Sequence, residues 1–201
     1  RNSKKSRPCH LHTRKLLYPN APTCYNTITT IRLLHCNPKK ARSRQTKKPS
    51  KECDGRMNIR NAQEQDAAQI AAVLEDAYNI DSIQEGITIF KKEQTKGYHY
   101  LVAEEDNKIV GITTWQMHGL PKHQLAELDR IAVLKTHQGK GLGKQLFDAL
   151  LKEASKEYEK HNQKLRKLYL LTHADNEQAQ TFYKKLGMQQ EAILKNHFYE
   201  G

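Results

Sequence analysis

Regular spacing of apolar residues begins near residue 57 and continues almost to the end of the chain. The spacing i, i+3, i+4, i+7 indicates an amphipathic helix, and Ile70, Val73, Leu74 and Ala77 follow it. Helices predicted in this way cover residues 64–78, 82–96, 142–160 and 176–186. Runs rich in β-branched and aromatic residues predict strands over residues 57–62, 98–104, 108–116, 125–134, 167–172 and 188–194.

The order of these elements is β-α-α-β-β-β-α-β-α-β. The turn residues Glu105, Asp106 and Asn107 separate two strands as in a hairpin. This hairpin-connected group precedes two β-α units, so the sequence predicts a mixed central sheet flanked by helices, of the α/β (α+β) class.

Residues 1–56 differ in composition from the rest of the chain. They hold 15 of the 34 Lys and Arg residues but 2 of the 22 Asp and Glu residues, whereas residues 57–201 are nearly neutral. All four cysteines and five of the six prolines also lie before residue 57. Sparse apolar residues and frequent prolines favour disorder. We therefore predict a basic, disordered tail or upstream extension over 1–56 and one folded domain over 57–201.

Besides a dispensable tail, three functional interpretations of the basic segment are possible. Blocks of basic residues bind nucleic-acid phosphates, and an acid-poor composition suits an organellar transit peptide. A zinc site is the third, but it lacks a C-x-x-C pair and its spacings are long. Its ligands would come from Cys9, Cys24, Cys36, Cys53, His10, His12 and His35. We expect no metal, and nucleic acid only through this segment.

A glycine-rich loop, residues 138–144, lies between a predicted strand and a predicted helix. Glycines let the backbone turn sharply and approach a ligand, and a helix N-terminus attracts phosphate. The glycines stand at 139, 141 and 143, and Gly143-Lys144 is followed by Gln145. That spacing fits neither a Walker loop nor a dinucleotide fingerprint.

A second motif, residues 176–187, places Ala179, Phe182, Tyr183 and Leu186 on one helical face. Such a tyrosine is ordinarily a core residue. Together, however, Gln-x-x-Gly-x-Gly after a strand and Asn-x-x-Ala-x-x-Phe-Tyr-x-x-x-Gly about 33 residues later resemble the GCN5-related N-acetyltransferase (GNAT) superfamily. The resemblance spans residues 57–201, and the order of elements is similar to that of the family.

The resemblance implies acetyl-CoA as co-substrate and assigns its site residue by residue. The pyrophosphate would contact Gln138, Gly139, Lys140, Gly141, Leu142, Gly143 and Lys144. The backbone of Ile131, Ala132 and Val133 would lie along the pantetheine and acetyl group, with Asn176 near the pantetheine. Tyr183 becomes the general acid for the leaving thiolate, and Glu127 stands where one branch of the family has a glutamate base.

The chemistry explains why a base is needed. An amine of pKa 10.4 is neutral in about one molecule in 2,500 at pH 7, so a carboxylate must remove a proton. By period two, Glu127 and Asp129 share one face of their strand, and for either the plainer interpretation is a solvated carboxylate or an ion pair with Arg130 or a lysine. The resemblance also implies one more strand at the end of the sheet, and we expect this closing strand to be missing from the sequence.

These observations predict an N-acetyltransferase that moves an acetyl group to a primary amine by direct attack in a ternary complex. The acceptor is left open between a protein N-terminus, a lysine, a polyamine and a small-molecule amine, with a slight preference for a cationic or protein substrate. The alternative is a non-catalytic acyl-CoA-binding protein with a nucleic-acid- or ribosome-binding arm. No apolar run approaches the roughly 18 residues of a membrane span, and no secretion signal is evident. We expect a cytoplasmic protein with no membrane partner, and a dimer is left open.

Overall fold

The protein is described by a computed structural model, which covers residues 27–34, 57–78 and 80–195. The zinc ligands considered for the basic segment lie outside these residues. The strands are β1 (Thr27–Leu34), β2 (Asn58–Asn61), β3 (His99–Glu105), β4 (Lys108–Met117), β5 (Leu125–Val133), β6 (Lys167–His173) and β7 (Gln189–Lys195). The helices are α1 (Ala67–Tyr78), α2 (Ile83–Thr95), α3 (Leu142–Lys160) and α4 (Glu177–Lys185).

From residue 57 onward, the order of elements is the one that the sequence predicts. Most boundaries agree within two residues, although the start of the first predicted helix is a 3-10 turn, Glu64–Asp66. Gly97 and Gly187 take the left-handed backbone expected after a helix, with φ of 82° and 86°. The α/β class and the mixed, helix-flanked sheet are confirmed.

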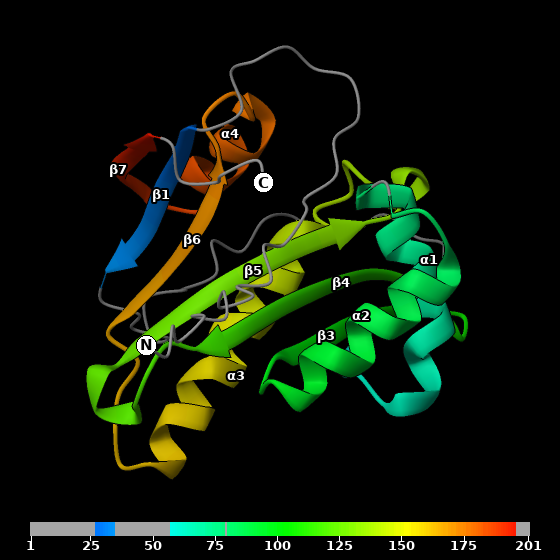
Figure 1. The fold of residues 1–201 in the computed structure, drawn as a ribbon, viewed down its shortest axis with the longest axis horizontal. Helices are drawn as coiled ribbons and strands as arrows, with labels where there is room; N and C mark the ends of the chain where they lie inside the picture. Colours follow the sequence, from blue (N-terminus) through cyan, green and yellow to red (C-terminus); the bar gives the residue numbers. More distant parts are fainter. Residues whose placement is uncertain (1–26, 35–56, 79, 196–201) are drawn as a thin grey trace, which may run out of the picture.

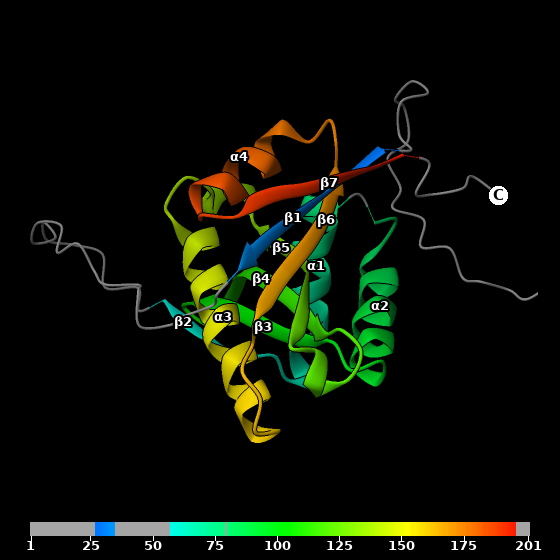
Figure 2. The same ribbon diagram turned by 90° about the vertical axis from the view of Figure 1, so that its left-hand side faces the viewer.

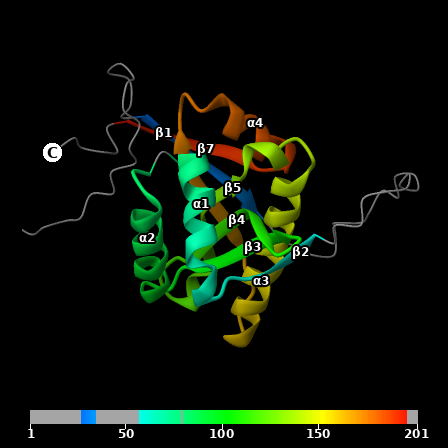
Figure 3. The ribbon, with the colours of Figure 1, turned by 90° about the vertical axis from the view of Figure 1, so that its right-hand side faces the viewer.

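The described strands form one sheet in the order β2-β3-β4-β5-β6-β1-β7. β5 and β6 are parallel, and the other neighbours are antiparallel. Figures 2 and 3 show α1 and α2 on one face of the sheet and α3 on the other. No described helix is long and apolar enough to cross a membrane.

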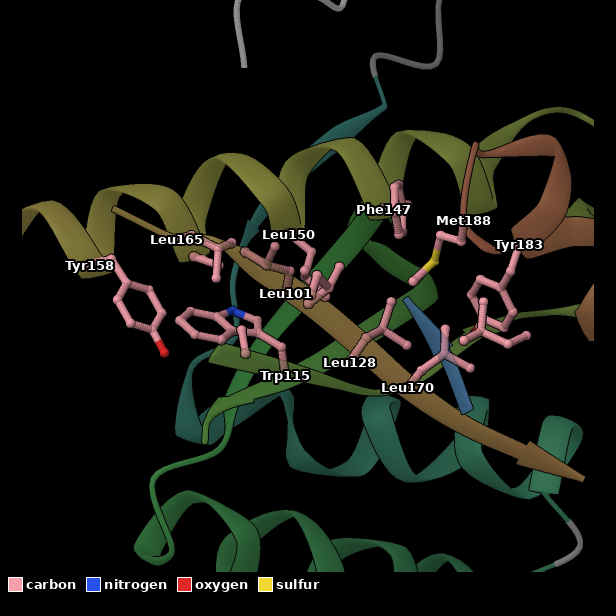
Figure 4. Packing of buried hydrophobic residues seen from close by; sticks show 14 residues of the cluster. Leu101, Trp115, Leu128, Phe147, Leu150, Tyr158, Leu165, Leu170, Tyr183 and Met188 are labelled. Atoms are coloured by element: carbon pink, nitrogen blue, oxygen red, sulfur yellow. The ribbon is translucent and has the colours of Figure 1, made fainter. Parts of the chain in front are cut away.

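The larger part of the core lies between the sheet and the helices α3 and α4. Trp115, Phe147 and Tyr158 are almost completely buried there (Figure 4). The polar atoms of the Trp115 and Tyr158 side chains have partners: the Trp115 indole donates to Glu153 over 3.1 Å, and the Tyr158 hydroxyl donates to the Leu125 carbonyl. The strands of this face are therefore held firmly, which fixes the positions of the site residues described below.

β1 is an unexpected part of the sheet. The prediction that residues 1–56 are disordered is wrong for Thr27–Leu34, which pairs along its length with β6 and also pairs with β7 (Figure 1). Thr29 and Ile31 are buried, with 2% and 4% of their surfaces exposed. Glu191 of β7 binds both Arg32 of β1 and Lys167 of β6, at 3.2 and 2.6 Å. β1 therefore joins β7 to the rest of the sheet.

Candidate active site

The two parallel strands in the middle of the sheet separate soon after they begin. β5 and β6 pair at Leu125–Lys167, Ala126–Leu168 and Glu127–Tyr169, and their paired register ends there. Figure 1 shows the two strands diverging toward their carboxyl ends. Ile131, Ala132 and Val133 pair with β4 on one side, so their other edge faces the separation. This edge can hydrogen-bond an extended ligand.

A bulge in β5 lies just beyond the point of separation. Trp115 pairs with Leu128 and Thr114 with Arg130, so Asp129 is the extra residue. A bulge changes the alternation of side chains along its strand. Accordingly, Leu128 and Ile131 both pack toward α3 and α4, although they stand three positions apart, an odd spacing that would otherwise put them on opposite faces.

The carboxyl end of β5 leads into the glycine loop and α3. Gln138 ties the loop to the strand, because its side-chain amide donates to the Val133 carbonyl over 2.9 Å. Gln145 donates to the Gly141 carbonyl over 3.2 Å, which leaves the N–H groups of Leu142, Gly143 and Lys144 without partners inside the helix. Together with the helix dipole, these groups suit an anion.

The glycines of the loop serve different purposes. Gly139 and Gly141 have φ of 76° and 81°, a backbone that side chains rarely adopt, and an added Cβ would meet nothing within 4 Å. Their surroundings are therefore open enough for a ligand to approach the backbone. At Gly143, in contrast, a Cβ would lie 3.2 Å from the ring of Phe182, so the close packing of α3 on α4 leaves little room for a side chain there.

Tyr183 comes from α4 and lies beside β5. It is 8% exposed and packs in the same cluster as Ile131, and Figure 4 shows it at the end of the core formed by Met188 and Leu170. Burial raises the pKa of its phenol well above the usual value, and the nearby Tyr78 and Asp129 raise it further. Tyr183 therefore keeps its proton at neutral pH and can donate a hydrogen bond.

Glu127 occupies the last paired position before the strands separate. Its Oε2 atom accepts hydrogen bonds from the Gln116 amide at 2.9 Å and the Tyr169 hydroxyl at 3.2 Å. Glu127 stands four positions before Ile131, a distance of about 13 Å along β5. The structure therefore brings Tyr183 close to Ile131 and leaves Glu127 at the far end of the site.

Two predicted ligand residues also have structural partners. The Asn176 side chain caps α4 by accepting from the Ala179 N–H at 3.0 Å, and its amide nitrogen is left as a donor. The Lys144 ammonium group binds Asp148 one turn along α3. Lys140 is exposed on the loop. Of the lysines assigned to the pyrophosphate, Lys140 is thus the better placed to meet an anion.

Sequence reasoning missed a charged network on the opposite face of β5. Arg130 binds Glu93 of α2 at 2.9 Å and its own neighbour Asp129 at 2.7 Å. Asp129 also accepts from Thr114 at 3.2 Å, and Glu93 accepts from Tyr100 at 2.5 Å. These two carboxylates raise the pKa of Arg130 against the opposing effect of its burial. The pairing of Arg130 with its neighbour is the ion pair considered from the sequence, but Glu93 was not foreseen.

Two further contacts hold the site from α1. The Tyr78 hydroxyl donates to the Ile131 carbonyl at 3.3 Å, and Asp76 accepts from the Lys135 N–H at 3.0 Å. A pocket of about 680 Å³ lies elsewhere, between α4 and the strands β1 and β7. Among the described residues, no cluster of three or more His, Cys, Asp or Glu side chains could hold a metal ion.

Comparison with known proteins gives a consistent result. The model of the acetyltransferase (GNAT) family matches residues 64–188, more than half of the chain. A Bacillus subtilis (strain 168) protein, whose provisional name is ribosomal protein bS18-alanine N-acetyltransferase, is 34% identical over 101 residues. This match covers 50% of the chain and 60% of the relative, so the chain spans less than two thirds of that protein's length.

Solved structures agree with the family match. An N-acetyltransferase from Staphylococcus aureus Mu50 is 25% identical with a TM-score of 0.52, over 65% of this chain and 82% of its own. A GNAT-family protein from Novosphingobium aromaticivorans shares the fold with a TM-score of 0.55 at 15% identity, over 84% of this chain and 62% of its own. The resemblance found in the two sequence motifs is confirmed, and the chain belongs to the acetyltransferase (GNAT) family.

Proposed function

We propose that the protein transfers an acetyl group from acetyl-CoA to a primary amine by direct attack in a ternary complex. One observation carries the proposal: the outer edge of β5 at Ile131, Ala132 and Val133 leads directly to the helix N-terminus of the glycine loop. An acyl-CoA needs both features, because its pyrophosphate is an anion and its pantetheine is a chain of amides. Tyr183 lies beside the same edge.

The loop residues fit the pyrophosphate. The open backbone at Gly139 and Gly141 lets phosphate oxygens approach the N–H groups of Leu142 and Gly143. Lys140 adds positive charge. Acetyl-CoA supplies the activated thioester when it is bound.

The carboxylates and phenol of the site perform the proton chemistry. Glu127 takes the proton from the acceptor ammonium group, directly or through water, so that the neutral amine can attack the thioester carbonyl. N–H groups of β5 stabilise the oxyanion that forms. Tyr183 then gives its proton to the sulfur as the C–S bond breaks, and its phenolate takes the second proton of the attacking nitrogen, so that the products are a neutral amide and a free thiol and Tyr183 is regenerated.

Asp129 is a second candidate for the base. It lies two residues closer to Ile131 than Glu127 does, and its charge influences Tyr183. Its carboxylate, however, binds the Arg130 guanidinium at 2.7 Å and accepts from the Thr114 hydroxyl at 3.2 Å, so both contacts compete with an incoming ammonium group. We therefore assign Glu127 as the base and Asp129 to the placement of the amine.

The acceptor amine remains to be chosen by experiment. The provisional name of the Bacillus subtilis relative refers to N-acetylation of an alanine of a ribosomal protein. Because an alanine has a free amine only at the start of a chain, peptides with an N-terminal alanine are the first substrates to test. Lysine peptides, polyamines and small amines follow. A protein acceptor of this kind would place the enzyme in the cytoplasm.

The test is release of free thiol from acetyl-CoA by the full chain with this panel of amines. Tyr183→Phe, which keeps the aromatic ring, is expected to lower turnover by about 10²–10⁴ with acetyl-CoA affinity nearly unchanged. Glu127→Gln is expected to lose rate, and the loss should shrink as pH rises and the amine deprotonates unaided. Asp129→Asn is expected to raise KM more than it lowers kcat.

Three results would contradict the proposal. Binding of acetyl-CoA without turnover on any amine would favour a non-catalytic acyl-CoA-binding protein whose basic segment binds a partner. A Glu127→Gln defect independent of pH would remove Glu127 from the base role. Full turnover in both Tyr183→Phe and Glu127→Gln would overturn the mechanism.

A further inference from the structure

A chain of polar side chains connects Glu127 to the surface. The Tyr169 hydroxyl lies 3.2 Å from Oε2 of Glu127 and 2.7 Å from Nδ1 of His118. Glu127 and Tyr169 are partly buried, whereas His118 is exposed. The three residues come from β5, from β6 and from the position directly after β4, so tertiary structure alone brings them together.

Backbone pairing fixes the geometry of this chain. Glu127 and Tyr169 are direct partners in the parallel register of β5 and β6. The His118 N–H donates to the Leu125 carbonyl at 2.8 Å, which holds the histidine against β5. The rings of His118 and Tyr169 meet edge to face with centroids 5.6 Å apart. The distances therefore follow from the strands and do not depend on a flexible loop.

Tyr169 is suited to transferring a proton without becoming charged itself. Burial raises the pKa of its phenol well above the usual value, and the charge of Glu127, its hydrogen bond to Glu127 and the nearby Tyr98 raise it further. The residue stays a neutral phenol at physiological pH. A neutral phenol can accept one proton at its oxygen while it gives up another, so that the phenol is neutral before and after the transfer.

A base that works repeatedly must lose the proton it gains in each turnover. Glu127 is partly buried, and its Oε2 atom already accepts from Gln116 at 2.9 Å. A route to solvent is therefore useful to the site. Histidine is the side chain whose ordinary pKa suits exchange of protons with water near neutral pH.

We propose that Tyr169 and His118 form a relay that carries the substrate proton from Glu127 to solvent. The relay rests on the proposed function, in which Glu127 is the base. The acceptor ammonium group gives one proton to the Glu127 carboxylate. The protonated Glu127 passes that proton to the Tyr169 oxygen, and Tyr169 passes its own proton to Nδ1 of His118. Before this step, the His118 ring is in the neutral tautomer that carries its proton on Nε2. The exposed imidazolium then releases one proton to water, and Tyr169 ends as it began.

The experiment measures turnover of the full chain at low and high buffer concentration. His118→Gln keeps a polar side chain of similar length but cannot titrate. We expect it to lower kcat by about tenfold in dilute buffer, less than the 10²–10⁴ contributed by a direct acid–base group, because water can still carry protons slowly. Added imidazole should restore kcat, and KM for both substrates should not change. Tyr169→Phe, which breaks the middle link, should behave in the same way.

His123→Gln is the matched control. His123 lies on the same β4–β5 connection, but its ring accepts from the Leu120 N–H at 3.2 Å and is not part of the chain of residues. We expect this variant to have normal turnover at every buffer concentration. A general effect of losing a histidine from this connection would appear in both variants.

The outcomes separate the relay from the function on which it rests. Normal kcat of His118→Gln in dilute buffer, with Glu127→Gln impaired, would overturn the relay and leave the proposed function standing. Loss of activity in His118→Gln that imidazole does not restore would indicate a structural role and would also overturn the relay. Normal kcat in Glu127→Gln would remove the base itself, and the relay with it.

Discussion

Ile31 provides the clearest test of whether β1 belongs to the folded protein. The side chain is 4% exposed and packs in the cluster that contains Tyr183, Met188 and Leu170. Ile31→Ala removes most of this buried side chain without introducing a polar group. If β1 is paired in solution as in the structure, the substitution must lower the free energy of unfolding.

The magnitude follows from burial. Truncation of a buried isoleucine to alanine costs about 2–5 kcal/mol, and Ile31→Val, which removes one methylene, about 0.5–1.5 kcal/mol. Ile193 is the matched control, because it lies on the neighbouring strand β7 but is 55% exposed. A surface substitution such as Ile193→Ala is expected to change stability by no more than about 0.5 kcal/mol.

Urea unfolding of the full chain measures the effect. With a slope of about 2 kcal/mol/M, a loss of about 3 kcal/mol moves the midpoint down by about 1.5 M, with the order parent, Ile31→Val, Ile31→Ala. Equal midpoints for Ile31→Ala and Ile193→Ala would refute the position of β1. Residues 1–56 would then be dispensable, and residues 57–201 alone would bind acetyl-CoA as tightly as the full chain.

Three other predictions test separate parts of the structure. Gly141→Ala places a side chain at φ of 81°, at a cost of about 1–2 kcal/mol if the loop keeps its shape; calorimetry should show weaker acetyl-CoA binding, and unchanged affinity would contradict the assigned role of the loop. Arg60 lowers the pKa of Asp66 below its ordinary 3.8, so the stability that this pair provides is complete above about pH 4 and lost as pH falls further. The urea midpoint should therefore drop less between pH 5 and pH 3 in Asp66→Asn than in the parent. Arg130→Met leaves two carboxylates facing each other, and a loss of about 3–5 kcal/mol in thermal unfolding is expected; a higher melting temperature would show that the network opposes folding.

The elements after residue 57 could be predicted because local signals and tertiary packing agree there. The stripe Leu142, Leu146, Leu150 and Ala154 is buried against the sheet as its spacing indicates. Asp106 and Asn107 both have positive φ, 50° and 62°, as a tight hairpin requires.

β1 was missed because the composition of a long segment concealed a short strand. Five of the eight residues in Thr27–Leu34 are β-branched, which is a strand signal. Prolines and basic residues on both sides favoured disorder for the whole segment. The strand depends on pairing with β6 and β7, which are more than 130 residues away along the chain. Residue propensities within a short window cannot predict such distant pairing.

The residues of the site were predictable only to the extent that they lie in contiguous motifs. The glycine loop and Tyr183 could be assigned to a candidate site because each belongs to a short pattern. Tyr78, Glu93 and Tyr169 come from elements without such a pattern, and each reaches β5 through tertiary contacts. A tyrosine on a helical stripe cannot be distinguished from a core residue by its spacing.

The bulge at Asp129 shows why strand alternation alone could not describe this site. With strict period two, Glu127, Asp129 and Ile131 would lie on one face of β5. The extra residue places Arg130 toward Glu93 of α2 and turns Ile131 toward α4, where it packs in the cluster of Tyr183. The bulge at Asp129 thus allows the carboxylates of Glu127 and Asp129 to lie on one side of the strand and the phenol of Tyr183 on the other. In the mechanism proposed above, an acetyl group at the edge of β5 would lie between them, with proton removal from the amine on one side of the reacting carbon and protonation of the sulfur on the other.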